Sequence, residues 1–522
     1  MPQLRVSNAG QIGLVADQPS RKLPAAAWTT LHNWVVSGGC IKIAEGHEDV
    51  AGPTGTFYQI FPLYFGEQYY WYFAGPTAIT EWDGTTSSDR TRSAGAYTGS
   101  ANNRWNGGNL NGLPVLNNSG IDAPQYQATP GTSLFADLDW DAVDTWTTKG
   151  NRCKCMRPHG NFLIAMDMTE SGTRNAQVVR WSDPAAVGSV PTNWEPGAGK
   201  YAGRLSLADT SGRIIDGLGL GDDFIVYKDD SIHRLIYTQD RYVFRRRKLT
   251  GVAGIMGQYC VADIGGAHAV LAPGDILLIE GNQPVSIADE LVKNALFNEI
   301  DADNYVNCFL TYDIYKNQLW VCYPVGSIWP NKALLWNRKD GGWSHRDLPT
   351  AMSCLVPGVD VLGATGTWAT ATGTWAEQTD TWATRLYNQS INTLFSLSNA
   401  GDLFRMNSGP NFGASAPECT AERINLELGV LNGSGRVGDI NKVTAVYPML
   451  EASGPISVFV GSAHDENQGT IWTGPYSFDP ARQHRITCNV TGRFHGVRFY
   501  SNTGISADLH GYAIEFARVG SQ

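Results

Sequence analysis

The sequence lacks long apolar runs and has few charged residues. No stretch of 18 consecutive apolar residues occurs, and no basic segment followed by an apolar one stands at the start. We therefore expect neither a membrane span nor a secretory signal. Charged residues make up 17% of the chain, against about 25% in an average soluble protein. Apolar residues make up 42%, enough for a packed core, which argues against disorder.

Motifs of catalysis are also missing. The sequence has no GxSxG, no Walker loop, no HExxH and no GxGxxG that follows a strand. We therefore predict no catalytic residues, no cofactor and no enzymatic activity. The two carboxylates of a glycosidase need only lie roughly 5–9 Å apart, so the sequence cannot select such a pair among its many acidic residues.

Metal-ligating residues are few and poorly spaced. Nine cysteines, an odd number, are scattered at irregular intervals, which fits reduced, buried thiols made in a cytoplasm. Cys153 and Cys155 with His159 come nearest to a zinc site, but no second cysteine pair follows. The run DLDWDAVD at 137–144 lacks the glycine and distal glutamate of a calcium loop. We predict two alternating strand cysteines, a solvated acidic turn and no metal.

Basic residues are outnumbered, and the net charge is −10. An acidic chain is poorly suited to holding nucleic acid through its phosphates, although it could surround DNA that must slide past. The one dense basic run is Arg245 to Lys248. One short run is not a basic stripe, and we interpret it as the solvated or interface end of a strand.

Glycine and aromatic residues are abundant instead, with 58 Gly, 17 Trp and 21 Tyr. Short β-branched and aromatic runs recur about every 8–15 residues and are separated by Gly, Asp, Asn and Pro, which predicts an all-β fold. Between 160 and 350 these runs group into successive sheets. The stretches GDDFIVYKDDSIHRL and PGDILLIEGNQPVSI resemble each other, as the blades of a propeller do. We predict a β-propeller-like region at 31–415, with an array of sandwiches as the alternative.

Other regions depart from this pattern. Residues 1–30, with Pro19 and Pro24, are predicted to form an extended N-terminal arm that lies across a neighbouring subunit. Residues 76–135 are rich in Gly, Asn, Ser and Thr, and we predict an inserted surface loop that a neighbouring subunit covers. A second insertion is predicted at 355–390. From 416 to 522 alternating patterns return and predict a separate C-terminal β-sandwich domain.

The second insertion contains the repeat TGTWATATGTWAEQTDTWATR, in which Trp368, Trp375 and Trp382 fall seven residues apart. Thr and Gly recur throughout and are poor helix formers, which argues against a heptad helix. Three readings stay open for this candidate loop: a self-packed aromatic cluster, a tip that contacts a partner, or a ligand-binding row.

Several stretches resemble a family of virion proteins from short-tailed bacteriophages. They lie at 6–47, 161–196, 212–235 and 332–349, and the most specific is the element WSDPAAVGSVPTNW. Its family-motif residues, which we take to be structural, are Arg180, Trp181, Ser182, Asp183, Pro184 and Trp194. The finer resemblance is to the tail nozzle, or tail tubular protein B.

The resemblance implies a virion protein that is assembled in the bacterial cytoplasm as a hexameric ring of propellers with a β-rich platform. Its partners would be the tail adaptor at the portal vertex and the tail fibres or spikes. DNA would pass through the channel without specific binding, and contact with the host envelope would follow at the tip. Two alternatives are a propeller-type adhesin that binds host glycans, motivated by the Trp-rich loops, and a polysaccharide depolymerase.

Overall fold

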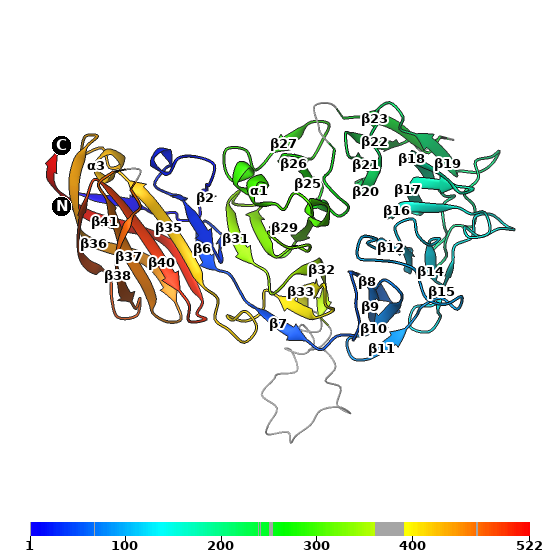
Figure 1. Ribbon diagram of the computed structural model, residues 1–522, viewed down its shortest axis with the longest axis horizontal. Helices are drawn as coiled ribbons and strands as arrows, with labels where there is room; N and C mark the ends of the chain where they lie inside the picture. The colour runs from blue at the N-terminus through cyan, green and yellow to red at the C-terminus, as the bar shows by residue number, and fades with distance from the viewer. Residues whose placement is uncertain are drawn as a thin grey trace, which may run out of the picture.

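The computed structural model describes residues 2–66, 68–238, 240, 242–249, 254–360, 391–465 and 468–521. Two units stand side by side in this part of the chain, a ring of small sheets and a sandwich that holds both termini (Figure 1). Within these residues, no helix has the length and apolar character needed to cross a membrane. Trp368, Trp375 and Trp382 fall outside the described residues, so the readings of their repeat remain predictions.

The ring consists of seven antiparallel four-stranded units in the described part of the chain. The first blade contains β8 (Gln59–Phe65), β9 (Gln68–Ala74), β10 (Ile79–Trp82) and β11 (Ser87–Asp89). The second contains β12 (Asn106–Leu110), β13 (Leu113–Asn117), β14 (Gln125–Gln127) and β15 (Phe135–Asp137). The third contains β16 (Arg152–His159), β17 (Phe162–Glu170), β18 (Thr173–Trp181) and β19 (Gly203–Ser206). The fourth contains β20 (Ile214–Leu220), β21 (Asp223–Lys228), β22 (Ile232–Tyr237) and β23 (Phe244–Lys248). The fifth contains β24 (Val261–Asp263), β25 (His268–Ala272), β26 (Asp275–Ile279) and β27 (Pro284–Ser286). The sixth contains β28 (Phe309–Asp313), β29 (Gln318–Tyr323), β30 (Lys332–Asn337) and β31 (Trp343–Asp347). The seventh contains β32 (Met352–Asp360), β33 (Ile391–Ser398), β34 (Leu403–Met406) and β7 (His47–Val50).

The ring is closed. The first strand of each blade contacts the first strand of the next blade, and β32 of the seventh blade contacts β8 of the first. The outer strand of the seventh blade is β7, which comes from the N-terminal part of the chain and pairs with β34 from Val50 opposite Leu403 to His47 opposite Met406. These contacts make the ring a β-propeller, as predicted, and exclude the array of separate sandwiches.

The blade strands follow the expected physics of a sheet packed on both faces. A middle strand such as β29 is buried along its whole length, because each blade is covered by the blade before it and the blade after it. The outer strand β23 has the opposite character, with Phe244 buried and four exposed basic residues after it. Charge of this kind protects an unpaired strand edge from adding another strand. The basic run from Arg245 to Lys248 is therefore a solvated outer strand.

The prediction of a surface loop at 76–135 is wrong. These residues contain β10, β11 and the second blade up to Phe135, the first residue of β15. Buried amide side chains stand where the prediction expected apolar residues. Such amides can be buried because each of them makes a hydrogen bond. The buried Asn117 donates to the Oδ1 atom of Asn106 at 3.0 Å, and Asn106 donates to the backbone oxygen of Lys154 at 2.9 Å. The segment is thus ordered by its own chain and needs no neighbouring subunit to cover it.

The second predicted insertion, 355–390, also begins too early. Residues 355–360 belong to β32, which pairs with β33 as the first two strands of the seventh blade. The rest of this insertion lies outside the described residues.

The predicted N-terminal arm at 1–30 is likewise wrong, because this segment packs against its own chain. Strand β1 (Gln3–Val6) pairs with β41 (Ala507–Ser521), and Trp28 is buried against Phe499 and Tyr512. Strands β5 (Trp34–Ser37) and β6 (Cys40–Ile43) join the same sheet as β41. Its buried apolar side chains fix it in place. The propeller therefore starts at β7 instead of residue 31.

The C-terminal sandwich is confirmed, but it is not the separate domain that was predicted, because one of its sheets continues into the propeller. Its strands are β35 (Cys419–Leu426), β36 (Asp439–Ala452), β37 (Ile456–Ala463), β38 (Ile471–Phe478), β39 (Ile486–Gly492), β40 (Phe494–Ser501) and β41, with a short helix α3 (Leu428–Leu431). The remaining short elements are β2 (Gly13–Leu14), β3 (Ala27–Trp28), β4 (Thr30–His32), α1 (Lys293–Glu299) and two 3-10 turns, Ser20–Lys22 and Tyr305–Asn307. Strand β4 lies between β31 of the sixth blade and β35, so one sheet runs from the propeller into the sandwich.

A buried histidine in the sandwich makes its stability depend on pH. His495 is 1% exposed and contacts the backbone oxygen of Gly492 at 3.1 Å. Burial lowers the pKa of His495 from its usual 6.5 to about 4. The unfolded chain therefore binds a proton between these two values that the folded chain does not bind, and stability falls as the pH falls through this window.

We expect acidification from pH 6.5 to 4 to cost about 3 kcal/mol through His495 alone, measured by urea unfolding of the whole chain. A His495→Gln variant should remove the share of this dependence that His495 contributes; His47 and His345 contribute too, because burial lowers the pKa of each to about 4. His484→Gln, at an exposed position of the same sandwich, should leave the dependence unchanged. Equal slopes for all three proteins would refute the assignment.

Candidate functional site

The middle of the propeller is filled by side chains instead of being open. We call Arg104, Arg157, Asp216 and Tyr259 the axial cluster. Arg104 precedes the second blade, yet it donates to the backbone oxygen atoms of Asn307 and of Ser353, which lie at the sixth and seventh blades. A contact that spans these blades crosses the centre of the ring.

The axial cluster is held by one buried ion pair. Arg157 on β16 donates to both carboxylate oxygens of Asp216 on β20, at 2.9 and 2.8 Å. The backbone N–H of Tyr259 donates to the same carboxylate at 3.0 Å, and the Tyr259 ring lies between the guanidinium groups of Arg104 and Arg157, 5.6 and 4.7 Å from its centre. Burial alone would raise the pKa of Asp216, but the Arg157 charge and these hydrogen bonds hold it below its usual value. DNA therefore has no path through the propeller's own axis.

The family-motif residues hold the long connection between β18 and β19. Arg180 donates to Glu170 at 2.7 Å and to the backbone oxygen of Trp194 at 2.9 Å, and its guanidinium lies over the ring of Trp140. Trp194 in turn stacks on Trp140 with ring centres 6.2 Å apart, and its edge meets Trp146 at 4.8 Å. The motif thus anchors this connection in the core between the second and third blades.

The rest of the motif fixes the end of the same connection. Asp183 accepts the backbone N–H groups of Tyr201 and Ala202 at 2.6 and 2.7 Å, and the indole of Trp181 donates to the backbone oxygen of Tyr201 at 2.8 Å. Ser182 accepts from the backbone N–H of Leu163 at 3.0 Å. Pro184, the residue after Asp183, lines a cleft that is described below.

Replacing Trp194 by alanine should destabilise the chain by about 3–5 kcal/mol, because a buried indole leaves a cavity that its two tryptophan neighbours cannot fill. Val187→Ala provides a matched control in the same connection, since Val187 is 92% exposed and its loss should change stability by less than about 0.5 kcal/mol. Urea midpoints of the two variants measure the difference. Similar midpoints would contradict a structural role for the motif.

The residues considered for metals are engaged in other contacts. The Cys155 thiol donates to Asp216 at 3.1 Å, and burial raises the pKa of Cys153 and Cys155. His159 contacts the backbone oxygen of Asp222 at 2.9 Å. Among the described residues, no group of three or more His, Cys, Asp or Glu could hold a metal ion.

The acidic run at 137–144 forms a closed turn. Asp141 accepts the backbone N–H groups of Val143 and Asp144, both at 2.9 Å. Lys149 pairs with Asp144 at 2.9 Å and with Asp141 at 3.5 Å.

All nine cysteines of the chain are buried and free of disulfides, which confirms the prediction of buried thiols.

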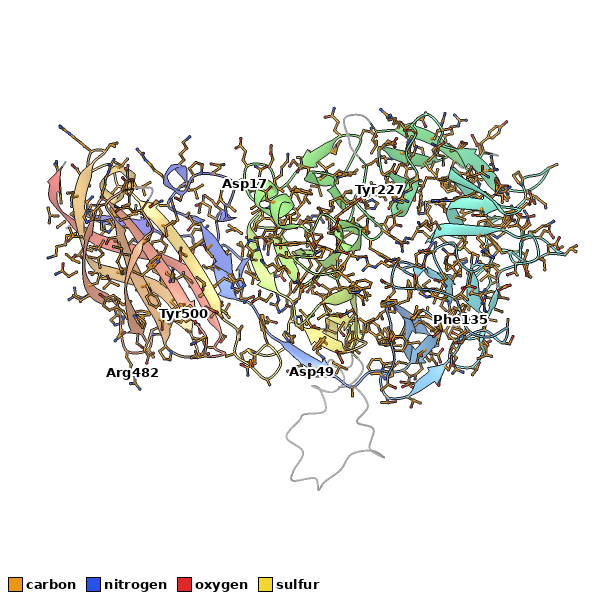
Figure 2. All side chains as sticks on the ribbon, viewed as in Figure 1. Asp17, Asp49, Phe135, Tyr227, Arg482 and Tyr500 are labelled. Atoms are coloured by element: carbon orange, nitrogen blue, oxygen red, sulfur yellow. The ribbon has the colours of Figure 1, made fainter. Side chains whose placement is uncertain are left out.

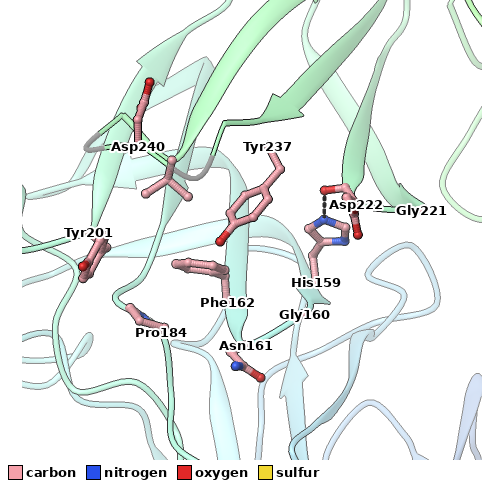
Figure 3. Close-up of a pocket in the computed structure, with 11 residues that line it drawn as sticks. His159, Gly160, Asn161, Phe162, Pro184, Tyr201, Gly221, Asp222, Tyr237 and Asp240 are labelled. Carbon is pink, nitrogen blue, oxygen red and sulfur yellow. Dashed lines mark hydrogen bonds between the residues drawn. The ribbon is translucent and has the colours of Figure 1, made fainter.

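A cleft of about 650 Å³ opens between the turns of the third and fourth blades (Figure 3). Its lining includes His159, Asn161, Phe162, Tyr201, Asp222 and Tyr237. Sequence reasoning missed this site, because its residues come from four separate connections. The one available signal was the motif itself, which fixes Tyr201 and contributes Pro184.

Neither the comparison with protein-family models nor that with curated proteins finds a match. Among solved structures, the chain is similar to a streptogramin B lyase, with 10% identity and a TM-score of 0.39 over 69% of this chain and 97% of that one. This distant likeness has no bearing on activity.

Proposed function

We propose that the chain is a structural protein of a short-tailed phage tail that assembles into a ring-shaped nozzle. The ring would sit below the portal adaptor, retain packaged DNA and guide its exit, and carry tail fibres or spikes. The proposal starts from the resemblance at 6–47, 161–196, 212–235 and 332–349. The propeller joined to a β-sandwich agrees with the architecture that this resemblance implies.

One observation carries the proposal furthest. Two of the resembling stretches, 6–47 and 332–349, meet at the junction between propeller and sandwich. His32 and Asn33 contact the two carboxylate oxygens of Asp347, both at 2.9 Å, and the N–H of Asp347 donates to the side-chain oxygen of Asn33 at 3.0 Å. Two of the four resembling stretches therefore meet where the two units are joined, whereas the other two lie in the third and fourth blades.

The axial cluster and the charge of the chain support the same role. Since each propeller is filled at its centre, a DNA channel requires several copies arranged around a common axis. A cyclic ring uses head-to-tail contacts that close only at the correct rotation. Each copy contributes a net charge of −10, and like charge disfavours adhesion of DNA to the ring.

Electron microscopy of the purified full-length chain, alone and with the adaptor of the same virus, tests this role. The proposal requires closed rings, and antibodies against the chain should label the distal end of the tail on virus particles. A chain that is absent from the particles would refute the proposal. The alternative of a glycan-binding propeller is favoured by one feature, the aromatic cleft, whereas no observation favours a depolymerase.

A further inference from the structure

We propose that the cleft between the third and fourth blades binds a neutral oligosaccharide through the exposed rings of Tyr201 and Tyr237. This binding does not require the ring proposed above, because every lining residue belongs to one copy of the chain. The volume of about 650 Å³ lies within the range of roughly 300–1,000 Å³ that is typical of small-molecule sites.

The cleft is built from turns that one face of the propeller brings together. Residues 159–162 connect β16 to β17, and Gly221 with Asp222 connects β20 to β21. Tyr237, Asp240 and Val243 lie between the middle of the fourth blade and its outer strand β23, and the connection from β18 to β19 contributes Pro184 and Tyr201. Loops on a rigid β-scaffold are the usual place for binding residues.

Three aromatic rings, those of Phe162, Tyr201 and Tyr237, line the cleft. Tyr201 is 53% exposed and Tyr237 is 37% exposed, whereas Phe162 is buried at their base. The rings of Phe162 and Tyr237 lie 6.4 Å apart at 58° (Figure 3). A tyrosine offers an apolar face and a polar hydroxyl, and a sugar ring offers the complementary surface, with C–H groups on its faces and hydroxyls at its rim.

Both exposed tyrosines are held in place through their backbones. The N–H of Tyr201 donates to Asp183 at 2.6 Å, and its carbonyl accepts from the Trp181 indole at 2.8 Å. The N–H of Tyr237 donates to Asp223 at 3.0 Å. A backbone that is fixed before the ligand arrives loses less entropy on binding. Acidic residues and a tryptophan thus position the backbones of both tyrosines, and the Tyr237 ring also packs against Phe162 and Phe244 of the core.

The polar groups of the cleft match hydroxyl-rich ligands. The exposed side chains of Asp222 and Asn161 have no hydrogen-bond or ion-pair partner among the described residues. A carboxylate accepts hydrogen bonds and an amide both donates and accepts them, which suits sugar hydroxyls. Asp240 is already engaged, because it accepts from Thr238 and Tyr242 and pairs with Arg245 at 3.0 Å. The two carboxylates make the cleft unfavourable for uronic or sialic acids, so the ligand is neutral.

The test begins with the full-length chain on an array of neutral hexose and N-acetylhexosamine oligosaccharides and of anionic ones. Titration calorimetry then follows with the best neutral binder. We expect Tyr201→Ala and Tyr237→Ala each to weaken binding on the order of tenfold or more, because an anchoring aromatic ring contributes over about 1 kcal/mol. Tyr201→Phe keeps the ring and should bind nearly as the parent chain does.

Tyr64→Ala serves as the matched control, because Tyr64 is 54% exposed on the first blade and away from the cleft. It should leave the affinity unchanged. All substituted rings are exposed, so each variant should keep the parent circular dichroism spectrum. An array without any neutral binder overturns the proposal, as does unchanged affinity in both alanine variants. If the parent chain binds no glycan and the alanine variants no longer assemble into rings, the cleft is a contact between copies instead.

Discussion

A chain that lacks residues 2–50 should fail to fold, in both the propeller and the sandwich. The deletion removes β7, the outer strand of the seventh blade, and leaves β34 with an unpaired edge. It also removes β1, β5 and β6 from the sheet of β41, and β4 from between β31 and β35. Buried side chains lost with these strands include Trp28, Leu31 and Trp34. Each buried aliphatic or aromatic side chain contributes on the order of 2–5 kcal/mol, and the whole domain is stable by only about 5–15 kcal/mol.

Circular dichroism and solubility of the deletion variant measure this result. A graded control is the deletion of residues 2–6, which removes only the four-residue strand β1 and should leave a folded chain of lower stability. If the chain without residues 2–50 were soluble and folded, the prediction of an extended arm at 1–30 would stand, and the closure of the ring by β7 would be wrong.

The variant Asp216→Asn should lower the free energy of unfolding by about 3–5 kcal/mol, because it leaves the buried Arg157 charge without a partner. Asp216 is fully buried and receives both hydrogen bonds of the Arg157 guanidinium. The Tyr259 N–H and the Cys155 thiol also lose the negative charge of the carboxylate that accepts their hydrogen bonds. The pKa of Asp216 is held below its usual value, so this contribution is present at neutral pH and is lost as the pH falls through that lowered pKa.

The matched control is Asp229→Asn, which removes a pair between Asp229 and Arg213 that is 3.8 Å long and about half exposed. Exposed pairs contribute about 0–1 kcal/mol, so the urea midpoint should hardly move. The double variant Asp216→Leu with Arg157→Met should recover part of the loss, since it leaves no unpaired charge. Similar midpoints for Asp216→Asn and Asp229→Asn would show that the axial cluster does not secure the propeller.

The sequence predicts the buried blade strands well and the polar ones poorly. Strands such as β17 and β29 are continuous apolar runs because blades cover both of their faces. The second blade has strands of three to five residues, and its amides replace apolar side chains. No local pattern distinguishes a buried, hydrogen-bonded asparagine from one in a surface turn, which is why 76–135 was predicted as a loop.

Contacts between residues far apart in the chain were the second feature that the sequence did not predict. The pairing of β7 with β34 joins residues about 350 positions apart, and neither strand carries a sign of its partner. Tyr201 and Tyr237 are two of 21 tyrosines in the sequence, and only the fold shows that both border one cleft. The motif from Arg180 to Trp194 was recognised from sequence, but its effect on Tyr201 became clear through the hydrogen bonds of Asp183 and Trp181.

The filled propeller and the acidic charge connect the structure to the proposed role. A chain whose own axis is blocked by Arg104 and the Arg157–Asp216 pair can surround DNA only by assembling with other copies. The sheet that runs from the sixth blade through β4 into the sandwich lets propeller and platform move as one body in such an assembly. The aromatic cleft would then add contact with a sugar surface to the proposed mechanical role.

Electron microscopy of the assembled full-length chain tests the central claim most directly. The account predicts closed rings, of six copies if the family resemblance holds, with an open lumen at the common axis and density filling the centre of every propeller. A chain that stays at the mass of a single copy at every concentration, also when produced together with the adaptor protein, would contradict it.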